Sequence, residues 1–122
     1  MDKAQAIDLF WNSFDLIAYD ENTVPDEAVM PYITYSMSSG AMDDILLMSA
    51  SLWYKSMSWA EITKKSDLIA EDIGYGGTVK SIDGGYIYIT RGTPFAQRMG
   101  DPSDQSIRRM LINITVEFLT AT

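Results

Sequence analysis

The stretch SIRRMLINITVEFLT, residues 106–120, contains an unbroken alternation of apolar and mixed side chains. One face would carry Met110, Ile112, Ile114, Val116 and Phe118, and the other Leu111, Asn113, Thr115 and Glu117. The same stretch also holds apolar residues at helical spacing, namely Ile107, Met110, Leu111, Ile114 and Phe118. Ile, Thr and Val dominate its middle, and such β-branched side chains favour extended backbone. We therefore predict a long strand with one buried face.

Two further strands are predicted upstream of this segment. Residues 31–38 are rich in β-branched and aromatic side chains, and residues 48–57 alternate in polarity. We expect these two strands to pair antiparallel, with a turn over residues 39–47. Residues 78–90 read as a hairpin, because Asp83-Gly84-Gly85 supplies the flexible backbone of a tight turn. Residues 91–106, rich in Gly, Pro and Asp, are expected to form a loop.

Two helices complete the predicted fold. Apolar residues at helical spacing predict one helix over residues 3–18. The second is expected after Ser58, where Ser58 and Glu61 form the S-x-x-E pattern of a capping box, and should end near Gly74. Residues 19–31 are predicted to be a solvated loop rather than a calcium site, since the ligand spacing of an EF-hand is missing. The order predicts an α+β protein, a single domain over residues 1–122, with a mostly antiparallel sheet of about five strands and two helices packed on one face.

The composition limits the function. The chain carries 17 acidic and 9 basic residues, so its net charge is −8, which disfavours wrapping of nucleic acid or binding to anionic membranes. Cysteine and histidine are absent, which removes disulfides, thiolate ligands and the usual acid–base catalyst. No apolar run approaches the roughly 18 residues of a membrane span, and no signal peptide is evident. We expect no cofactor, no metal, no membrane association and no enzymatic activity.

All four arginines lie within twenty residues. Residues 1–90 hold fourteen acids and five lysines, whereas Arg91, Arg98, Arg108 and Arg109 all fall in residues 91–110. Guanidinium groups pair well with carboxylates. Another copy of the chain could supply these from either of two acidic patches, Asp20, Glu21, Asp26 and Glu27, or Asp43 and Asp44. Two interpretations stay open: an interface between proteins, or plain solvation of a loop. RNA binding is a weaker third, because the rest of the chain is acidic.

Trp53 would stand on the more polar face of the second strand. A tryptophan in that position is either covered by a helix or available to a partner. Trp53 therefore joins Arg91, Arg98, Arg108, Arg109, Asp43 and Asp44 as a candidate interface residue. A carboxylate dyad of Asp43 and Asp44 is disfavoured, because neighbouring residues of a strand point to opposite sides. The glycines of residues 74–77 and 84–85 are explained by turns, since the P-loop pattern is missing.

The phrases VMPYITYSMS, SLWYKSMSWAEI and DGGYIYITRGTPFAQRM, followed by RMLINITVEFL, resemble small structural proteins of tailed bacteriophages and prophages. The layout is similar to that of the tail terminator, or tail-completion, family of long non-contractile tails. The resemblance implies a subunit that forms a hexameric ring, caps the tail tube, ends its polymerisation and docks to the head connector. DNA would pass through the lumen without specific binding.

This resemblance places the protein in the virion, at the head–tail junction, and in the host cytoplasm during assembly. Its implied partners are copies of itself, the tail tube protein and the head connector protein. Another minor protein of the head–tail connection would share the layout. A small protein-binding adaptor module, with Trp53 and the arginines as its recognition surface, is the alternative from a different class.

Overall fold

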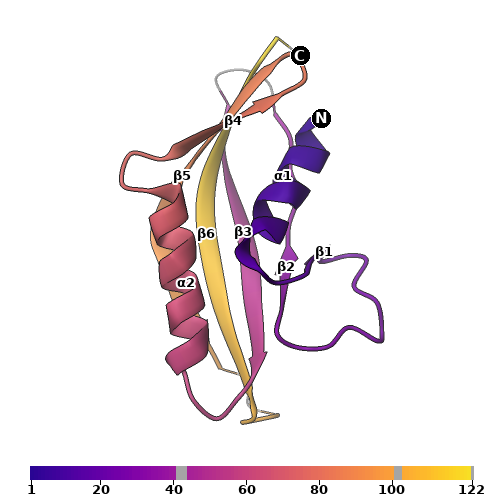
Figure 1. Cartoon of the computed structure of the whole chain (residues 1–122), viewed down its shortest axis with the longest axis vertical. Helices are drawn as coiled ribbons and strands as arrows, with labels where there is room; N and C mark the ends of the chain where they lie inside the picture. The colour runs from indigo at the N-terminus through magenta and orange to yellow at the C-terminus, as the bar shows by residue number, and fades with distance from the viewer. Residues whose placement is uncertain (41–43, 101–102, 122) are drawn as a thin grey trace.

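The centre of the molecule is a sheet whose three long strands are β3 (Ile45–Lys55), β6 (Ile107–Thr120) and β5 (Gly85–Met99). The computed structural model describes residues 1–40, 44–100 and 103–121 (Figure 1). The strands lie in the order β1-β2-β3-β6-β5-β4, and every pair except β1–β2 is antiparallel. The prediction of an α+β protein with a mostly antiparallel sheet is confirmed at this level, with six strands in place of about five.

The alternation along β6 decides which side of the sheet is the core. Met110, Ile112, Ile114, Val116, Phe118 and Thr120 are buried, whereas the residues between them are half-buried. The strand prediction for residues 106–120 is therefore confirmed. The helical alternative fails because β6 pairs along its length with β3 on one side and β5 on the other. Burial of each large apolar side chain contributes about 1.5–3 kcal/mol, which favours the extended backbone here.

Both helices cover the same face of the sheet. Helix α1 (Lys3–Trp11) is followed by a short 3₁₀ turn, η1 (Asn12–Phe14), and α2 (Ala60–Ile73) lies along β5 and β6, with strands visible between the two helices (Figure 1). Helix α1 buries Ala6, Ile7, Phe10 and Trp11, and α2 buries Ile62, Ser66, Ile69 and Ile73. These side chains and the buried residues of β6 belong to one apolar cluster. In the part of the chain that the structure describes, no helix lies on the opposite face of the sheet.

The first helix is shorter than predicted, and a strand follows it. The chain leaves the helical conformation after Phe14, where Asp15 has a positive φ of 64°. The Asn12 side chain holds the reversal, because its Oδ1 accepts a 2.9 Å hydrogen bond from the Ala18 backbone N–H. Residues 18–20 then form β1 (Ala18–Asp20), parallel to β2 (Tyr32–Tyr35). The prediction of a helix to residue 18 and of a loop from residue 19 is wrong here, because the helical spacing of Ile17 and Ala18 was coincidental.

The segment after Arg91 is a strand and not the predicted loop. Strand β5 runs to Met99 and stays paired with β6, with a bulge between Arg91 and Ala96. Arg91 pairs with Ile114 and Ala96 pairs with Ile112, so residues 92–95 stand opposite Asn113 alone. The Asn113 side-chain amide donates a 3.0 Å hydrogen bond to the Pro94 carbonyl. Gly and Pro in this stretch therefore mark a bulge rather than the end of pairing.

The other predicted elements are present, but residues 45–47, predicted as the end of a turn, already belong to β3 and pair with β6. Strand β2 pairs antiparallel with β3, and β4 (Thr78–Ile82) forms a hairpin with β5 across Asp83 and Gly84. Helix α2 ends at Gly74, as expected, with a φ of 79° at that glycine. The predicted capping box is wrong in detail: Ser58 Oγ accepts from the Ala60 N–H, and Trp59 occupies the cap position. A capping box forms instead at the start of α1, from Asp2 and Gln5.

Candidate protein interface

The four arginines do not gather on one surface. Arg91 lies at the far end of α2, where its Nε and Nη2 donate hydrogen bonds of 3.1 and 2.7 Å to the Ala70 carbonyl. The Ala70 carbonyl also accepts a 3.0 Å hydrogen bond from the Gly74 N–H, and a cation at this end of a helix is stabilised by the helix dipole. Arg91 therefore holds the C-terminal turn of α2 against β5.

Arg98 and Arg108 both lie against Trp59, at the start of α2. Their guanidinium carbons are 4.9 and 5.2 Å from the centre of the indole ring. Arg108 also donates hydrogen bonds of 2.7 Å to the Gln105 carbonyl and 2.8 Å to the Met57 carbonyl. These contacts fix the connection between β3 and α2 to the start of β6. Both arginines thus have a structural role that the sequence did not indicate.

Arg109 points to the opposite face of the sheet, the one without helices. It stands across from Trp53 in the β3–β6 pair, with its guanidinium carbon 4.8 Å from the centre of the indole ring. Its Nε donates a 3.0 Å hydrogen bond to Ser51 Oγ, and Trp53 Nε1 donates a 2.9 Å hydrogen bond to Thr34 Oγ1. Among the described residues, no helix covers Trp53. The structure therefore excludes the alternative in which a helix buries this side chain.

We call the helix-free side of the six-stranded sheet the open face. Its residues follow from the strand register: Tyr19, Tyr32, Thr34, Ile45, Leu47, Ser49, Ser51, Trp53, Lys55, Val79, Ser81, Tyr86, Tyr88, Thr90, Gln97, Met99, Ile107, Arg109, Leu111, Asn113, Thr115, Glu117 and Leu119. Three of these strand residues are charged, namely Lys55, Arg109 and Glu117. Ile45 and Leu47 are 69% and 65% exposed, and Tyr86 is 52% exposed. The open face is thus a broad surface of aromatic, aliphatic and hydroxyl side chains with few charges.

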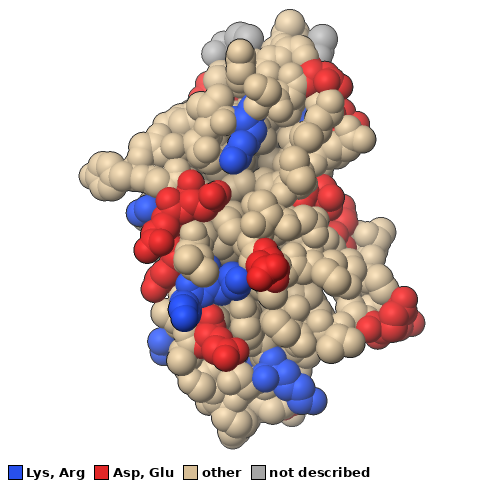
Figure 2. Space-filling model, in the orientation of Figure 1, with Lys and Arg blue, Asp and Glu red and all other residues tan. Residues whose placement is uncertain are grey.

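The helix-bearing side has a different character. Figure 2 shows acidic and basic side chains interleaved over α2, in the same orientation as Figure 1. The helix contributes Glu61, Asp67, Glu71 and Asp72 together with Lys64 and Lys65. A mixed-charge surface of this kind is typical of a solvated helix. The contrast between the two sides makes the open face the better candidate for an interface.

Asp44 is exposed and directly precedes β3, at the end of that strand opposite to Lys55. Its side chain lies beside Gly40, together with that of Leu46, which belongs to the helix-bearing side of β3. Asp43 lies outside the described residues. Of the seven predicted interface residues, the structure brings Trp53 and Arg109 together on the open face. Arg91, Arg98 and Arg108 lie on the helix-bearing side.

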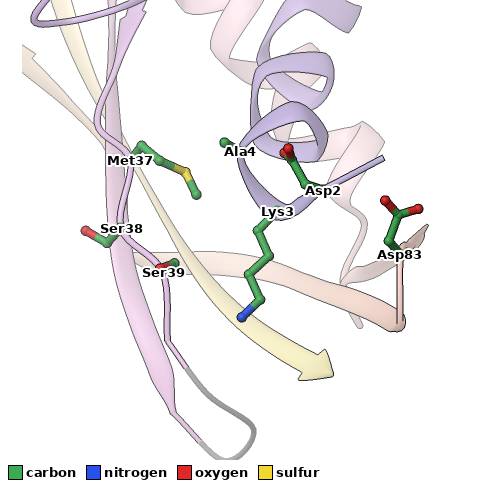
Figure 3. Close-up of a pocket in the computed structure, with 7 residues that line it drawn as sticks. All are labelled: Asp2, Lys3, Ala4, Met37, Ser38, Ser39 and Asp83. Atoms are coloured by element: carbon green, nitrogen blue, oxygen red, sulfur yellow. The ribbon is translucent and has the colours of Figure 1, made fainter. Parts of the chain in front are cut away.

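A hollow of about 630 Å³ lies between the start of α1, residues 37–39 and the β4–β5 turn. Figure 3 shows its charged side chains pointing in different directions, with Asp2 and Lys3 at the start of α1 and Asp83 in the β4–β5 turn. Lys3 Nζ donates to the Gly40 carbonyl, and Asp83 accepts from the Met1 amino group. These groups hold the start of the chain to the sheet and do not converge on one point, as a catalytic site requires.

Electrostatic perturbation is found away from the open face. Burial, the hydrogen bond to the Asp8 carboxylate and the charge of Asp8 raise the pKa of the Tyr35 hydroxyl. Burial and the charge of Glu61 raise the pKa of Tyr54. Hydrogen bonds from the Ser106 hydroxyl and backbone N–H lower the pKa of the Asp104 carboxyl, which shapes the turn before β6. Each shift has a local structural cause.

Comparison with protein-family models, curated proteins and solved structures finds no match to this chain. Within residues 1–40, 44–100 and 103–121, no three or more acidic side chains are grouped as a metal site would need. In the same part of the chain, no helix has the length and apolar character needed to cross a membrane. The open face is the feature of the described structure that bears most directly on function.

Sequence reasoning identified Trp53 and Arg109 but missed most of the open face. The missing signal was the second set of the β6 alternation, Leu111, Asn113, Thr115 and Glu117, read together with Leu47, Ser49 and Ser51 of β3. Once β3 and β6 are known to pair, these residues share one side. The register could not be deduced from the sequence, because residues 56–106 separate the two strands.

Proposed function

We propose that this protein is a structural assembly subunit whose open face docks onto another protein, and that its specific role is that of a phage tail terminator. In this role it forms a ring, caps the tail tube, ends tube polymerisation and joins the tail to the head connector. The single observation that supports it is the open face itself, an uncovered side of the sheet lined by aromatic and aliphatic side chains. The specific role in the tail follows from the resemblance of the sequence.

The shape of this surface favours a macromolecule over a small ligand. Small molecules bind in concave pockets with a few converging polar groups, whereas protein interfaces are broad and have apolar centres with aromatic and arginine anchors. The Trp53–Arg109 pair supplies such an anchor, because the indole holds the guanidinium in place and Ser51 fixes its Nε. An arginine already positioned in this way loses less conformational freedom when it binds.

The net charge of the chain supports a ring through which DNA can pass. A net charge of −8 repels the phosphate backbone, so a ring of such subunits would let DNA pass without holding it. The acids of the loop before β2, including Glu21, Asp26 and Glu27, are exposed. In a ring, surfaces of this kind would face either the lumen or the solvent. The protein would act in the virion, after assembly in the host cytoplasm, and without catalysis.

The second candidate is a protein-binding adaptor, or another connector protein of the head–tail junction. The observation in its favour is that the open face needs no ring to be useful, since one partner could cover it. An adaptor would bind its target with a fixed ratio and form no ring. A terminator would bind the end of a tube and no other part of it.

The experiment that tests the proposed function is the capping of tubes. A tail tube protein of a long non-contractile tail is polymerised with and without the purified chain, and tube lengths are measured by negative-stain electron microscopy. A terminator shortens the tubes in proportion to its concentration and is seen as a cap at one end. Unchanged tube lengths, with no density at either end, would reject this role. Arg109→Glu and Lys64→Glu provide a matched pair of variants on the open face and on α2.

A further inference from the structure

The charges of the open face are arranged by sign along the strands. Arg109 lies near the start of β6 and Glu117 near its end, and Asn113 is midway between them. On β3, Lys55 lies beside the Arg109 end. One end of the face is therefore basic and the other acidic. Within the described residues, neither Arg109 nor Glu117 forms an ion pair in the free chain.

Such an arrangement matches a second copy of itself. We infer that two chains pack through their open faces and are related by a two-fold axis. The axis lies between the two sheets, perpendicular to the strands, and passes over Asn113 and Ser49. These two residues are paired neighbours in the β3–β6 register, so one axis can pass over both. The rotation lays β6 over β6 in the antiparallel sense. Arg109 of each chain then faces Glu117 of the other, and the two contacts are equivalent, as in any isologous interface.

The uncharged residues agree with the same axis. On β3, Trp53 and Ile45 lie at equal distances on either side of Ser49, so Trp53 of each chain meets Ile45 of the other. On β5, Tyr88 pairs with Glu117 and Met99 pairs with Arg109, so Tyr88 faces Met99. The aromatic rings thus meet the exposed Ile45 side chain and the half-buried thioether of Met99. Such contacts bury apolar surface and favour association.

The alternative face-to-face arrangement is disfavoured by charge. A two-fold axis parallel to β6 would stack the strands in the parallel sense and place Arg109 over Arg109 and Glu117 over Glu117. Like charges brought together at an interface are unfavourable, so the charge pattern selects the antiparallel arrangement. The charges are about 27 Å apart along β6, at about 3.4 Å per residue, so both contacts can form without crowding.

The size of the surface suits a modest dimer. Packed sheets lie about 10 Å apart, a gap that long side chains such as Arg, Glu, Trp and Tyr can fill. Strands β3, β6 and β5 alone offer a footprint of roughly 600 Å², compared with about 800 Å² per partner in a standard interface. We expect a dimer that dissociates on dilution and weakens with salt, because its two ion pairs lie near the rim of the contact.

This dimer rests on the proposed function in one respect, since both treat the open face as a docking surface. It goes further because it names the occupant and the geometry for the free chain. A two-fold contact closes on two copies and does not build a ring. The dimer would keep the open face covered until the tube replaces the second copy. A chain that stays monomeric and still caps tubes overturns the dimer alone.

Charge reversal with rescue tests this inference by analytical ultracentrifugation. The wild-type chain should sediment as a dimer at high concentration. Glu117→Lys places like charges in both contacts and should raise the dissociation constant at least about tenfold. Adding Arg109→Glu to that variant exchanges the two charges and should restore dimerisation. Asp67→Lys on α2 makes the same change of net charge away from the open face and should leave the dimer unchanged.

The outcomes separate cleanly. A wild-type chain that is monomeric at every concentration overturns the inference, and so does a dimer that Glu117→Lys leaves intact. Failure of the double variant to regain affinity also overturns it, provided that its circular dichroism spectrum and melting curve match those of the wild type. If Arg109→Glu disturbs the fold, Glu117→Asp gives a second check. Its shorter side chain should weaken the dimer less than Glu117→Lys, whereas equal weakening counts against the ion pair.

Discussion

The guanidinium carbon of Arg109 lies 4.8 Å from the centre of the Trp53 indole ring, on the side of the sheet opposite to the helices. Arg98 makes the corresponding contact with Trp59 on the other side, at 4.9 Å. Two arginine–tryptophan pairs of almost equal geometry thus occupy opposite faces of one sheet. Substituting Arg109 and Arg98 in turn therefore distinguishes a contact that stabilises the fold from one that also belongs to an interface.

Arg109→Glu should weaken self-association and tube capping, whereas Arg98→Glu should leave both unchanged. The two substitutions change the net charge equally and each removes one cation–π contact, worth about 0.5–1 kcal/mol at an exposed site. They differ in the face they alter. Sedimentation and tube-length measurements on both variants make the comparison, with melting curves as the control for folding. Equal effects of the two substitutions on assembly would contradict the assignment of the open face.

Trp59→Ala should destabilise the fold by about 1–2 kcal/mol, because the indole contacts both Arg98 and Arg108 and each cation–π contact contributes about 0.5–1 kcal/mol. Urea unfolding, followed by circular dichroism, gives the free energy of unfolding. Tyr75→Ala is the matched control, because Tyr75 is 101% exposed and its removal should change stability little. If the two variants are equally stable, Trp59 does not join α2 to β6.

Gly92→Ala should destabilise the chain by about 1–3 kcal/mol, the usual cost of overpacking. A Cβ atom at residue 92 would lie 2.9 Å from backbone atoms of Asn113, which the bulge holds in place. Thermal unfolding measures the effect. Gly100→Ala is the control, because nothing lies within 4 Å of a Cβ at that position. A Gly92→Ala chain as stable as the control would mean that the bulge can shift to make room.

Most of the fold could be predicted because its signals are local. The alternation in residues 110–118, the turn at Asp83-Gly84-Gly85 and the stop at Gly74 each specify their own element. The predictions failed where a distant contact decides the structure. Arg91 and Ala96 remain in one strand because Asn113 of β6 holds the bulge between them, and no local pattern in residues 91–99 indicates that partner. Asn12 similarly ends α1 through a bond to Ala18.

The candidate site was harder to predict for the same reason. Arg91, Arg98, Arg108 and Arg109 are close in sequence, but the pleat sends Arg108 and Arg109 to opposite faces of β6. The contacts of Arg91 with Ala70, and of Arg98 with Trp59, depend on how α2 lies over the sheet. Proximity along the chain therefore suggested one patch where the structure has three separate sites. Trp53 lies on the helix-free face because alternation along its strand places it there, and its role as an interface residue stays a prediction.

Tyr35→Phe should make the chain more resistant to alkali. Burial, followed by the hydrogen bond to Asp8, raises the pKa of Tyr35 above its ordinary value of 10.0, so the folded chain keeps the proton after the unfolded chain has lost it. Stability from this group is complete below pH 10.0 and falls as the pH rises further. The free energy of unfolding across this range should therefore decline less steeply in Tyr35→Phe. Tyr75→Phe, altered at an exposed site, should retain the wild-type slope; equal slopes in both variants would contradict this account.

The central claim, that the open face is a docking surface, is tested most directly by thiol protection. The chain has no cysteine, so Ser49→Cys on the open face and Lys64→Cys on α2 each introduce a single thiol. Both are labelled with a maleimide, first as dilute monomers and then in the concentrated or tube-bound state, and the rates are compared by mass spectrometry. The account predicts that assembly slows the labelling of Cys at position 49 and leaves the rate at position 64 unchanged. Equal labelling of position 49 in the free and assembled chains would contradict it.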